Sequence, residues 1–388
     1  MDSAGGRPKV DFSLSPEQER IREAIAKLCA RFDDDYWLER DREGGFPADF
    51  HQAFARDGWL GIAMPEAYGG AGLGISEAAV MMQAIAESGA GFSGASAVHM
   101  NIFGLNPVVV YGNEEQKRRW LPPLIAGKER ACFAVTEPNT GLNTRALKTK
   151  AVKTANGYSV SGQKVWISTA QVAEKILLLA RADAGLTLFY TNLDRRHVEV
   201  REIEKMGRHA VDSNQVFLDG LPVPEADRIG EEGKGFEYIL HGMNPERILI
   251  GAELVGLGRC AVARAANYAK ERIVFDRPIG QNQAIQHPLA ANWMALEAAN
   301  LMAFKAASLY DAGKPCGAEA NAAKYLAGEA CFHACEQAVM TFGGFGYAAE
   351  YHVERYLRES FVGRIAPVSR ELILCFIAER VLGLPKSY

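Results

Sequence analysis

The chain has 388 residues, which is too many for one ordinary core and enough for two or three domains. Hydrophobic residues make up 48% of it and charged residues 23%, proportions that are typical of a globular protein and exclude a disordered one. With 43 Lys plus Arg against 47 Asp plus Glu, the net charge of −4 leaves no basic excess for nucleic acid. No apolar run approaches the length of a membrane span, so we expect no membrane-spanning helix.

The first part of the sequence is predicted to be helical, from Ser15 to about Gly127. Before it, residues 1–9 have neither a leader-type apolar stretch nor an Arg-rich amphipathic pattern, and we expect a short solvated tail. Ser15 precedes a proline, a glutamate and a glutamine, which together predict a capped helix start. A glycine-rich break at 69–74 separates two helical stretches, and another helix is predicted to begin at Asn113.

The periodicity changes near Ala131 to the alternation that is typical of strands. Asn156-Gly157 between two alternating runs predicts a β-hairpin. Several short strands with turn signals between them predict a small β-barrel or sandwich. The glycine-rich segment 230–235 is predicted to be the linker that leaves it. The strand candidates are residues 150–154, 158–167, 176–180, 186–191, 198–200 and 215–218.

The last part of the sequence is predicted to be a four-helix bundle, because its Ala-rich stretches are long and amphipathic. The predicted helices are residues 251–272, 283–312, 318–341 and 369–382. We therefore expect an α+β multidomain chain. Its predicted parts are an N-terminal α-helical domain (1–128), a middle β-barrel domain (129–236) and a C-terminal four-helix-bundle domain (237–388).

The seven cysteines are odd in number, scattered and mostly set in apolar helical patterns. A reduced, cytoplasmic setting suits them best. Cys331 and Cys335 flank His333 and could share a helix face. Because no fourth ligand is evident and cysteine is a common buried hydrophobe, we expect no metal site.

Three segments form a more specific pattern: Thr136-Glu137-Pro138 before the hairpin, Glu271 to Gly280 between two bundle helices, and Phe342 to Tyr347 after the third helix. Glycines in the last segment would let a flat or anionic group approach the backbone closely. With Tyr111-Gly112 and Lys205-Met206-Gly207, these segments occur in an order that resembles the acyl-CoA dehydrogenase family over nearly the whole chain.

The resemblance implies an FAD-dependent oxidoreductase of fatty acid metabolism, usually a homotetramer, that passes electrons to an electron-transferring flavoprotein. FAD would lie between the β domain and the bundle, where an arginine suits a buried pyrophosphate because its fork donates several charge-assisted hydrogen bonds. The cofactor residues implied within one chain are Phe133, Val135, Thr136, Gly141, Trp166 and Ser168. Those implied from a neighbouring subunit are Arg272, Phe275 and Gln283, and those at the adenine end are Gly343, Gly344, Ser369 and Glu371.

The implied reaction is α,β-dehydrogenation of an acyl-CoA thioester, in which a carboxylate removes the α-proton while a hydride passes to flavin N5. Most of the family carries that carboxylate in a C-terminal Tyr-Glu-Gly-Thr segment, but Pro367 stands at the position of the Glu. A minority, the isovaleryl and long-chain type, takes its base from the first bundle helix, where this sequence has Glu246. We therefore predict Glu246 as the catalytic base, with Asn244 and Arg247 binding the substrate.

The segment around Glu246 has a second interpretation without catalysis. Asn244 as a cap, Pro245 at the first helical position and Glu246 in the first turn would make an ordinary helix start. The favoured interpretation remains the base, because the family resemblance covers the whole chain.

The sequence also departs from the family near the expected site. Pro367 has no N–H with which to hold the thioester oxygen, and losing one such donor costs on the order of 3 kcal/mol in the transition state. Leu142 and Asn143 replace a usual Ser-Asp pair, and Met340 replaces a usual Gln. Two alternatives therefore stay open: a flavin monooxygenase or oxidase of the same fold, and a partner-dependent subunit of a mixed tetramer.

Overall fold

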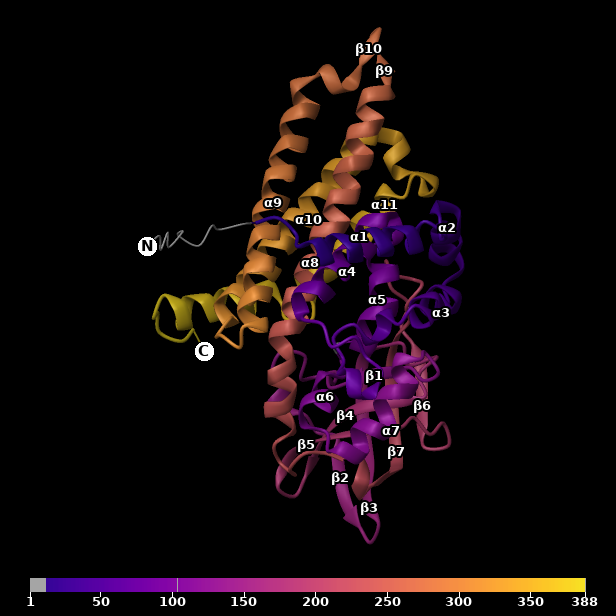
Figure 1. Ribbon diagram of the computed structural model, residues 1–388, viewed down its shortest axis with the longest axis vertical. Helices are drawn as coiled ribbons and strands as arrows, with labels where there is room; N and C mark the ends of the chain where they lie inside the picture. The colour runs from indigo at the N-terminus through magenta and orange to yellow at the C-terminus, as the bar shows by residue number, and fades with distance from the viewer. Residues whose placement is uncertain (1–11, 103, 388) are drawn as a thin grey trace, which may run out of the picture.

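The computed structural model describes residues 12–102 and 104–387, so the tail predicted at 1–9 lies outside the described residues. Figure 1 shows the strands of the middle part at one end of the molecule and the N-terminal helices at its centre. Two long C-terminal helices, α8 and α9, reach the opposite end. In the described part of the chain, no helix combines the length and the apolar character that crossing a membrane requires.

The N-terminal helices begin where the sequence places caps. Ser15 Oγ accepts a hydrogen bond from the Gln18 amide at 3.1 Å, and the Gln18 side chain accepts one from the Ser15 amide at 3.0 Å. Asn113 and Gln116 make the same reciprocal pair, which confirms both predicted helix starts. The helices are α1 (Pro16–Cys29), α2 (Asp34–Glu43), α3 (Ala48–Arg56), α4 (Ile75–Ile85), α5 (Gly91–Ile102), α6 (Asn106–Tyr111) and α7 (Glu114–Ile125).

Among the described residues, eight strands form one mixed sheet with the path β6-β7-β3-β2-β4-β5-β8, and β1 pairs with β4 in parallel. The hairpin predicted at Asn156-Gly157 is confirmed as the β2–β3 turn. The two-residue strand β8 was not predicted from the sequence. The strands are β1 (Ala131–Ala134), β2 (Lys150–Thr154), β3 (Gly157–Ser168), β4 (Lys175–Ala182), β5 (Gly185–Asn192), β6 (Val198–Glu202), β7 (Ser213–Pro224) and β8 (Arg228–Ile229).

The C-terminal part packs α10 between α8 and α9, with α11 against its end. A hairpin of two short strands, β9 (Ile273–Val274) and β10 (Arg277–Pro278), joins α8 to α9 at the far end of the molecule (Figure 1). The predicted helix 369–382 is found as α13, which Ser369 caps, followed by a π-helical segment at Ile377–Val381. The helices are α8 (Gly235–Glu271), α9 (Gln283–Asp311), α10 (Gly317–Phe342), α11 (Val353–Ser360), α12 (Val362–Ile365) and α13 (Arg370–Phe376). Helical parts on either side of a sheet confirm the predicted fold class.

The helix start proposed at Asn244 is wrong. Helix α8 begins at Gly235 and continues through Pro245, so Glu246 lies well inside it and not in a first turn. The turns before the proline are stable because they bury Tyr238 and Ile239 in a core shared with the β domain. A proline usually marks a first turn, but tertiary packing overrides that preference here.

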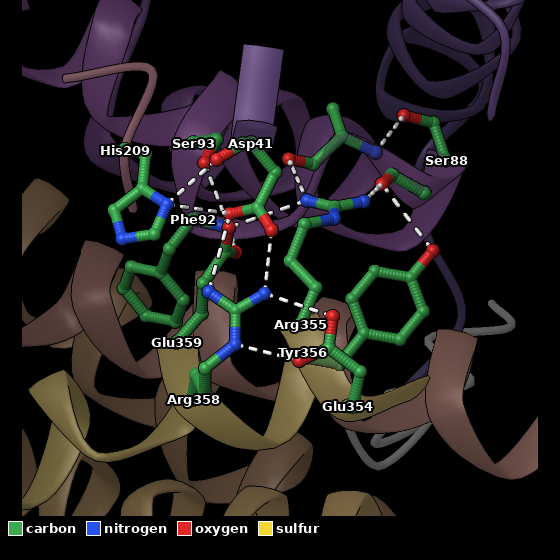
Figure 2. A network of polar contacts seen from close by, with 12 residues as sticks. Asp41, Ser88, Phe92, Ser93, His209, Glu354, Arg355, Tyr356, Arg358 and Glu359 are labelled. Carbon is green, nitrogen blue, oxygen red and sulfur yellow. Dashed lines mark hydrogen bonds and ion pairs between the residues drawn. The ribbon is translucent and has the colours of Figure 1, made fainter. Parts of the chain in front are cut away.

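A polar network joins the three parts of the chain, as Figure 2 shows. Asp41 of α2 accepts a hydrogen bond from Arg358 of α11 at 2.5 Å. His209, which follows β6, contacts the same aspartate: its Nδ1 lies 2.7 Å from the backbone oxygen and 3.3 Å from Oδ1. Glu354 completes the group with a 2.6 Å contact to Arg358 Nε. One carboxylate therefore connects an N-terminal helix, the middle part and the C-terminal part.

Candidate functional site

A narrow cavity lies where α8 meets the β domain and α6. Glu246 extends into it, with 17% of its side chain exposed. Pro367, from the segment between α12 and α13, lines the same cavity. The structure thus brings together the two positions that the family resemblance marks as alternative places for the base. The lining residues are Gly104, Pro107, Phe133, Ile239, Gly242, Met243, Glu246 and Pro367.

A buried histidine, His99, contacts Glu246, and a second buried carboxylate, Glu253, contacts that histidine. His99 of α5 places its Nε2 2.7 Å from Glu246 Oε2. Its other ring nitrogen, Nδ1, lies 2.6 Å from Glu253 Oε1. The side chain of His99 is 6% exposed and that of Glu253 is fully buried. The imidazole therefore bridges two carboxylates of one helix, of which only Glu246 reaches the cavity.

Burial and neighbouring charges shift the pKa values of His99 and Glu253. Burial alone would lower the pKa of His99, but the two carboxylates outweigh it and raise the pKa to about 10. Burial raises the pKa of Glu253, against an opposing effect of His99. At both residues, therefore, burial and the neighbouring charges shift the pKa in opposite directions.

Sequence reasoning missed His99 and Glu253, although α8 carried a signal. Glu253 stands alone in an apolar stretch of the helix, seven residues after Glu246. Two helical turns separate the pair, so both carboxylates lie on one face. A buried carboxylate needs a partner, and a histidine in the apolar α5 was the candidate.

The predicted substrate residues lie beside Glu246 in the same helix, outside the cavity lining. Arg247 donates from Nη1 to the Met243 backbone oxygen at 3.2 Å and to Asn244 Oδ1 at 3.4 Å. Burial lowers the pKa of Arg247, opposed by the charge of Glu246. Their part in substrate binding stays a prediction.

The predicted flavin residues of the β domain form one group near β1 and the end of β3. Phe133 lines the cavity with Glu246, and Val135 is buried in the adjoining core. Trp166 is 59% exposed, and its φ of 61° lies in the left-handed region. A bulky residue held in that conformation is typical of ligand sites. Thr136 accepts a backbone hydrogen bond from Val165 at 3.0 Å.

Ser168 and Gly141 complete this group in different ways. Ser168 Oγ accepts a 3.0 Å hydrogen bond from Arg208, a residue that the sequence did not suggest. Arg208 also donates to Ser96 of α5 at 3.2 Å, so it links the β domain to the N-terminal helices. Gly141 is exposed, with open space where a Cβ would stand.

Glu137, in the segment 136–138, has a structural role. Its carboxylate accepts hydrogen bonds from the Lys148 and Thr149 amides at 2.6 and 2.9 Å. The fully buried Lys164 contacts it at 3.1 Å. These bonds fix the approach to β2 against β3, and Glu137 is not part of the cavity lining.

Five further predicted cofactor residues lie away from the cavity: Arg272, Phe275, Gln283, Gly343 and Gly344. Arg272 shares an open pocket with Gly343 and Gly344, and its guanidinium lies 5.5 Å from the ring centre of Phe345. Phe275, at the turn of the β9–β10 hairpin, is 94% exposed. Gln283 opens α9 beside this hairpin. Figure 1 shows the hairpin and the β domain at opposite ends of the molecule, so one chain does not bring the two groups together.

Ser369 and Glu371 line a third hollow, with Phe361 and Arg364. Ser369 caps α13 by accepting from the Leu372 amide at 3.3 Å. Glu371 is exposed and contacts Arg370 Nε at 2.7 Å. Neither residue lines the Arg272 pocket or the Glu246 cavity, although Ser369 is two residues from Pro367 of that cavity.

The Cys331–His333–Cys335 segment does not converge on one point. The two sulfur atoms are buried and 4.0 Å apart. His333 instead lies in solvent, 3.4 Å from Glu336. Within the described residues no group of three or more His, Cys, Asp or Glu could hold a metal ion.

Three segments of the chain match known domains. Residues 15–128 match the acyl-CoA dehydrogenase N-terminal domain, 132–221 the middle domain and 233–382 the C-terminal domain. The chain belongs to the acyl-CoA dehydrogenase family. The protein is therefore an oxidoreductase, and its cofactor is FAD.

Its relatives agree with this assignment. The acyl-CoA dehydrogenase fadE12 of Mycobacterium bovis is 36% identical over 389 residues, which cover 97% of this chain and 99% of the relative. Butyryl-CoA dehydrogenase from Megasphaera elsdenii has a similar structure, with a TM-score of 0.92, 28% identity and coverage of 96% and 100%. The FAD complex of PigA has a TM-score of 0.92, 25% identity and coverage of 97% and 100%.

The described residues fit FAD by their chemistry. Trp166 and Phe275 expose aromatic rings that could cover a flat ring system. Arg272 forms no ion pair with any described residue, so its guanidinium is available to a diphosphate. Around Gly343 and Gly344 nothing lies within 4 Å of a Cβ position, which leaves the backbone open to a ligand.

Proposed function

We propose that this chain catalyses the α,β-dehydrogenation of an acyl-CoA thioester to the trans-2-enoyl-CoA, with Glu246 as the base that removes the α-proton. The observation that carries the proposal is the cavity. Among its described lining residues, Glu246 is the one ionisable side chain, and Phe133 and Pro367 lie with it. A single carboxylate in an apolar cavity beside predicted flavin residues suits proton removal next to a hydride acceptor.

The cavity explains how Glu246 would act. The other described lining residues are apolar or glycine, so a substrate in the cavity would meet Glu246 as the one side chain able to accept the α-proton. FAD, when bound, supplies the acceptor for the β-hydrogen as a hydride. Pro367 offers no N–H to the cavity, so the thioester oxygen would take its hydrogen bonds from other groups. Asn244 and Arg247 would contact the substrate near the thioester or the CoA arm.

We further propose that the enzyme works as a homotetramer in which each flavin lies between two chains. Phe133, Val135, Thr136, Gly141, Trp166 and Ser168 would come from one chain. The neighbour would add Arg272, Phe275 and Gln283, while Gly343, Gly344, Ser369 and Glu371 close the adenine end. The distance between these groups within one chain supports sharing (Figure 1). Exposed apolar side chains on the bundle also support assembly: Trp293, Met294, Leu301, Leu326 and Met340.

The cellular setting belongs to the same proposal. Reduced flavin must be reoxidised, and we propose an electron-transferring flavoprotein as the acceptor, in the cytoplasm and in fatty acid metabolism. The reduced state of the cysteines fits that setting, because the described cysteines form no disulfide.

Anaerobic reduction of the flavin tests the proposed reaction. The purified chain, loaded with FAD, is mixed with a panel of straight, branched and aryl acyl-CoA esters, and flavin bleaching is followed. At least one ester should bleach the flavin, and Glu246→Gln should slow bleaching by about 10²-fold or more, the usual worth of a general base. Glu237→Gln, an exposed change in the same helix, should leave the rate unchanged.

The same preparation separates the alternatives. Bleaching at the wild-type rate in E246Q would show that another group is the base. Rapid oxygen consumption without an added acceptor would favour an oxidase or monooxygenase. A colourless, unstable protein that recovers only with a homologous partner would indicate a subunit of a mixed tetramer.

A further inference from the structure

The cavity side of Glu246 is open to substrate, but the opposite side is closed by an ionisable group that the proposed reaction does not use. His99 of α5 joins Glu246 to Glu253 by contacts of 2.7 and 2.6 Å. A histidine between two carboxylates from different turns of one helix fixes the distance between α5 and α8 at this point. It also fixes which oxygen of Glu246 is left for the cavity.

Counting protons defines the state of this group. Each short contact between a ring nitrogen and a carboxylate oxygen needs one proton between the two atoms. A neutral imidazole with two ionised carboxylates has only one proton and would leave one contact between two lone pairs. The resting group therefore holds two protons and a net charge of −1. An α-proton accepted by Glu246 would be the third.

Burial places the negative charge on the cavity side. Glu253 is fully buried and Glu246 is 17% exposed, so the charge that is easiest to solvate is on Glu246. The pKa of His99, raised to about 10, agrees with an imidazolium between the two carboxylates. Two further charges act on the group: Arg208 on Glu253, and Arg247 beside Glu246.

We infer that His99 is a positioning residue for the proposed base: as an imidazolium balanced by Glu253, it holds Glu246 ionised with one oxygen directed at the cavity. This inference rests on the proposed function. The buried Glu253 is required because an unbalanced imidazolium would hold Glu246 as a weaker base. A missing imidazolium would leave the charge of Glu253 to repel that of Glu246 and favour the protonated form of Glu246. The pair thus sets the pH range in which Glu246 can accept the α-proton.

The pH profile of the bleaching rate tests this inference in the FAD-loaded enzyme. In His99→Gln the positive charge between the carboxylates is lost, so Glu246 binds a proton more readily. The acid limb of the profile should move up by about one pH unit or more. In Glu253→Gln one negative charge is lost, and the acid limb should not rise. His51→Gln, a change at another buried histidine, in α3, should give the wild-type profile.

The two variants separate charge balance from packing. The inference is supported if the acid limb moves to higher pH in H99Q and does not do so in E253Q. An equal upward shift of the acid limb in both variants, or no shift in H99Q, overturns the inference. If no acyl-CoA bleaches the wild-type flavin, the proposed function fails, and this outcome is distinct from wild-type bleaching with an unmoved H99Q profile.

A second measurement does not depend on activity or on the folding of H99Q. His209, the other histidine with a raised pKa, is first removed as His209→Gln. Solid-state NMR of that FAD-loaded protein, labelled with [15N]histidine, should then show one imidazolium at pH 8.5. Its two protonated nitrogens should show correlations to glutamate carboxylates. Absence of an imidazolium at that pH would overturn the inference.

Discussion

Glu246 of α8 and Pro367 of the segment between α12 and α13 line one cavity, although they lie far apart in the sequence. A carboxylate at either position would face the same space from a different wall. The family resemblance places a base at one or the other, and the shared cavity gives the physical reason. In the proposed reaction, a carboxylate moved from one wall to the other would have a different backbone support but would face the same cavity.

This relationship predicts a rescue. Glu246→Gln should slow flavin bleaching by about 10²-fold or more, because the amide cannot accept the α-proton. Adding Pro367→Glu to E246Q should raise the bleaching rate at least about tenfold above that of E246Q alone. The matched control is E246Q with Ile365→Glu, since Ile365 is nearby, 66% exposed and outside the lining. Equal rates in the double variants and in E246Q would contradict the idea of two interchangeable walls.

Cofactor binding should depend on the far end of the bundle. Arg272→Met removes a guanidinium that has no protein ion pair in the described structure. A charged hydrogen bond contributes about 1.5–3 kcal/mol, so FAD affinity should fall by roughly 10- to 100-fold. Arg277→Met is the control, because Arg277 is on the same hairpin but bonds to Asn282 at 2.7 Å. Fluorescence titration of the apoprotein with FAD measures both; equal affinities would remove Arg272 from the cofactor site.

Helix α8 contacts α4 closely enough to require a glycine. A Cβ at Gly256 would lie 2.3 Å from the Gln83 backbone oxygen, whereas one at Gly251 would meet no atom nearer than 3.6 Å. Gly256→Ala should therefore destabilise the protein by about 1–3 kcal/mol through overpacking. Gly251→Ala should be neutral or stabilising by up to about 1 kcal/mol, because alanine favours a helix. Thermal unfolding at one pH compares them, and a similar melting temperature for the two would refute the close contact.

The sequence predicted most elements because local signals mark their ends. Ser15 and Asn113 carry caps, and Asn156-Gly157 fixes a hairpin by its backbone conformation. The helix start predicted at Pro245 was wrong, because the residues before the proline are buried against another domain and this packing overrides the local signal.

The site was predictable only in part, for the same reason. Glu246 could be placed by resemblance, whereas Glu253 was missed although it stands alone in an apolar stretch of α8. The partner of both, His99, comes from α5, and no local pattern states which helices meet. The placement of the β9–β10 hairpin at the opposite end from the β domain likewise depends on how the long helices pack (Figure 1).

The contact between His209 and Asp41 should make stability depend on pH. The hydrogen bond with Asp41 raises the pKa of His209 to about 9, above the value of about 6.5 expected in the unfolded chain. The folded state therefore binds the proton more tightly. The contact between protonated His209 and Asp41 therefore stabilises the fold fully below about pH 6.5, and this contribution is lost as the pH rises through about 9. Since 34% of the ring is exposed, solvent reduces the effect to about 1 kcal/mol.

His209→Gln removes this effect while keeping a polar side chain beside α2. The melting temperature of the wild-type protein should exceed that of H209Q at pH 6, and the difference should shrink toward pH 9.5. His197→Gln is the control, because the described hydrogen bond of its ring goes to a backbone oxygen, that of Asp219, at 3.1 Å. A constant difference between wild type and H209Q across this range would mean that the two residues contribute packing and not charge. Asp41 should remain paired with Arg358 in H209Q, so the network of Figure 2 would lose one partner and keep its connection between α2 and α11.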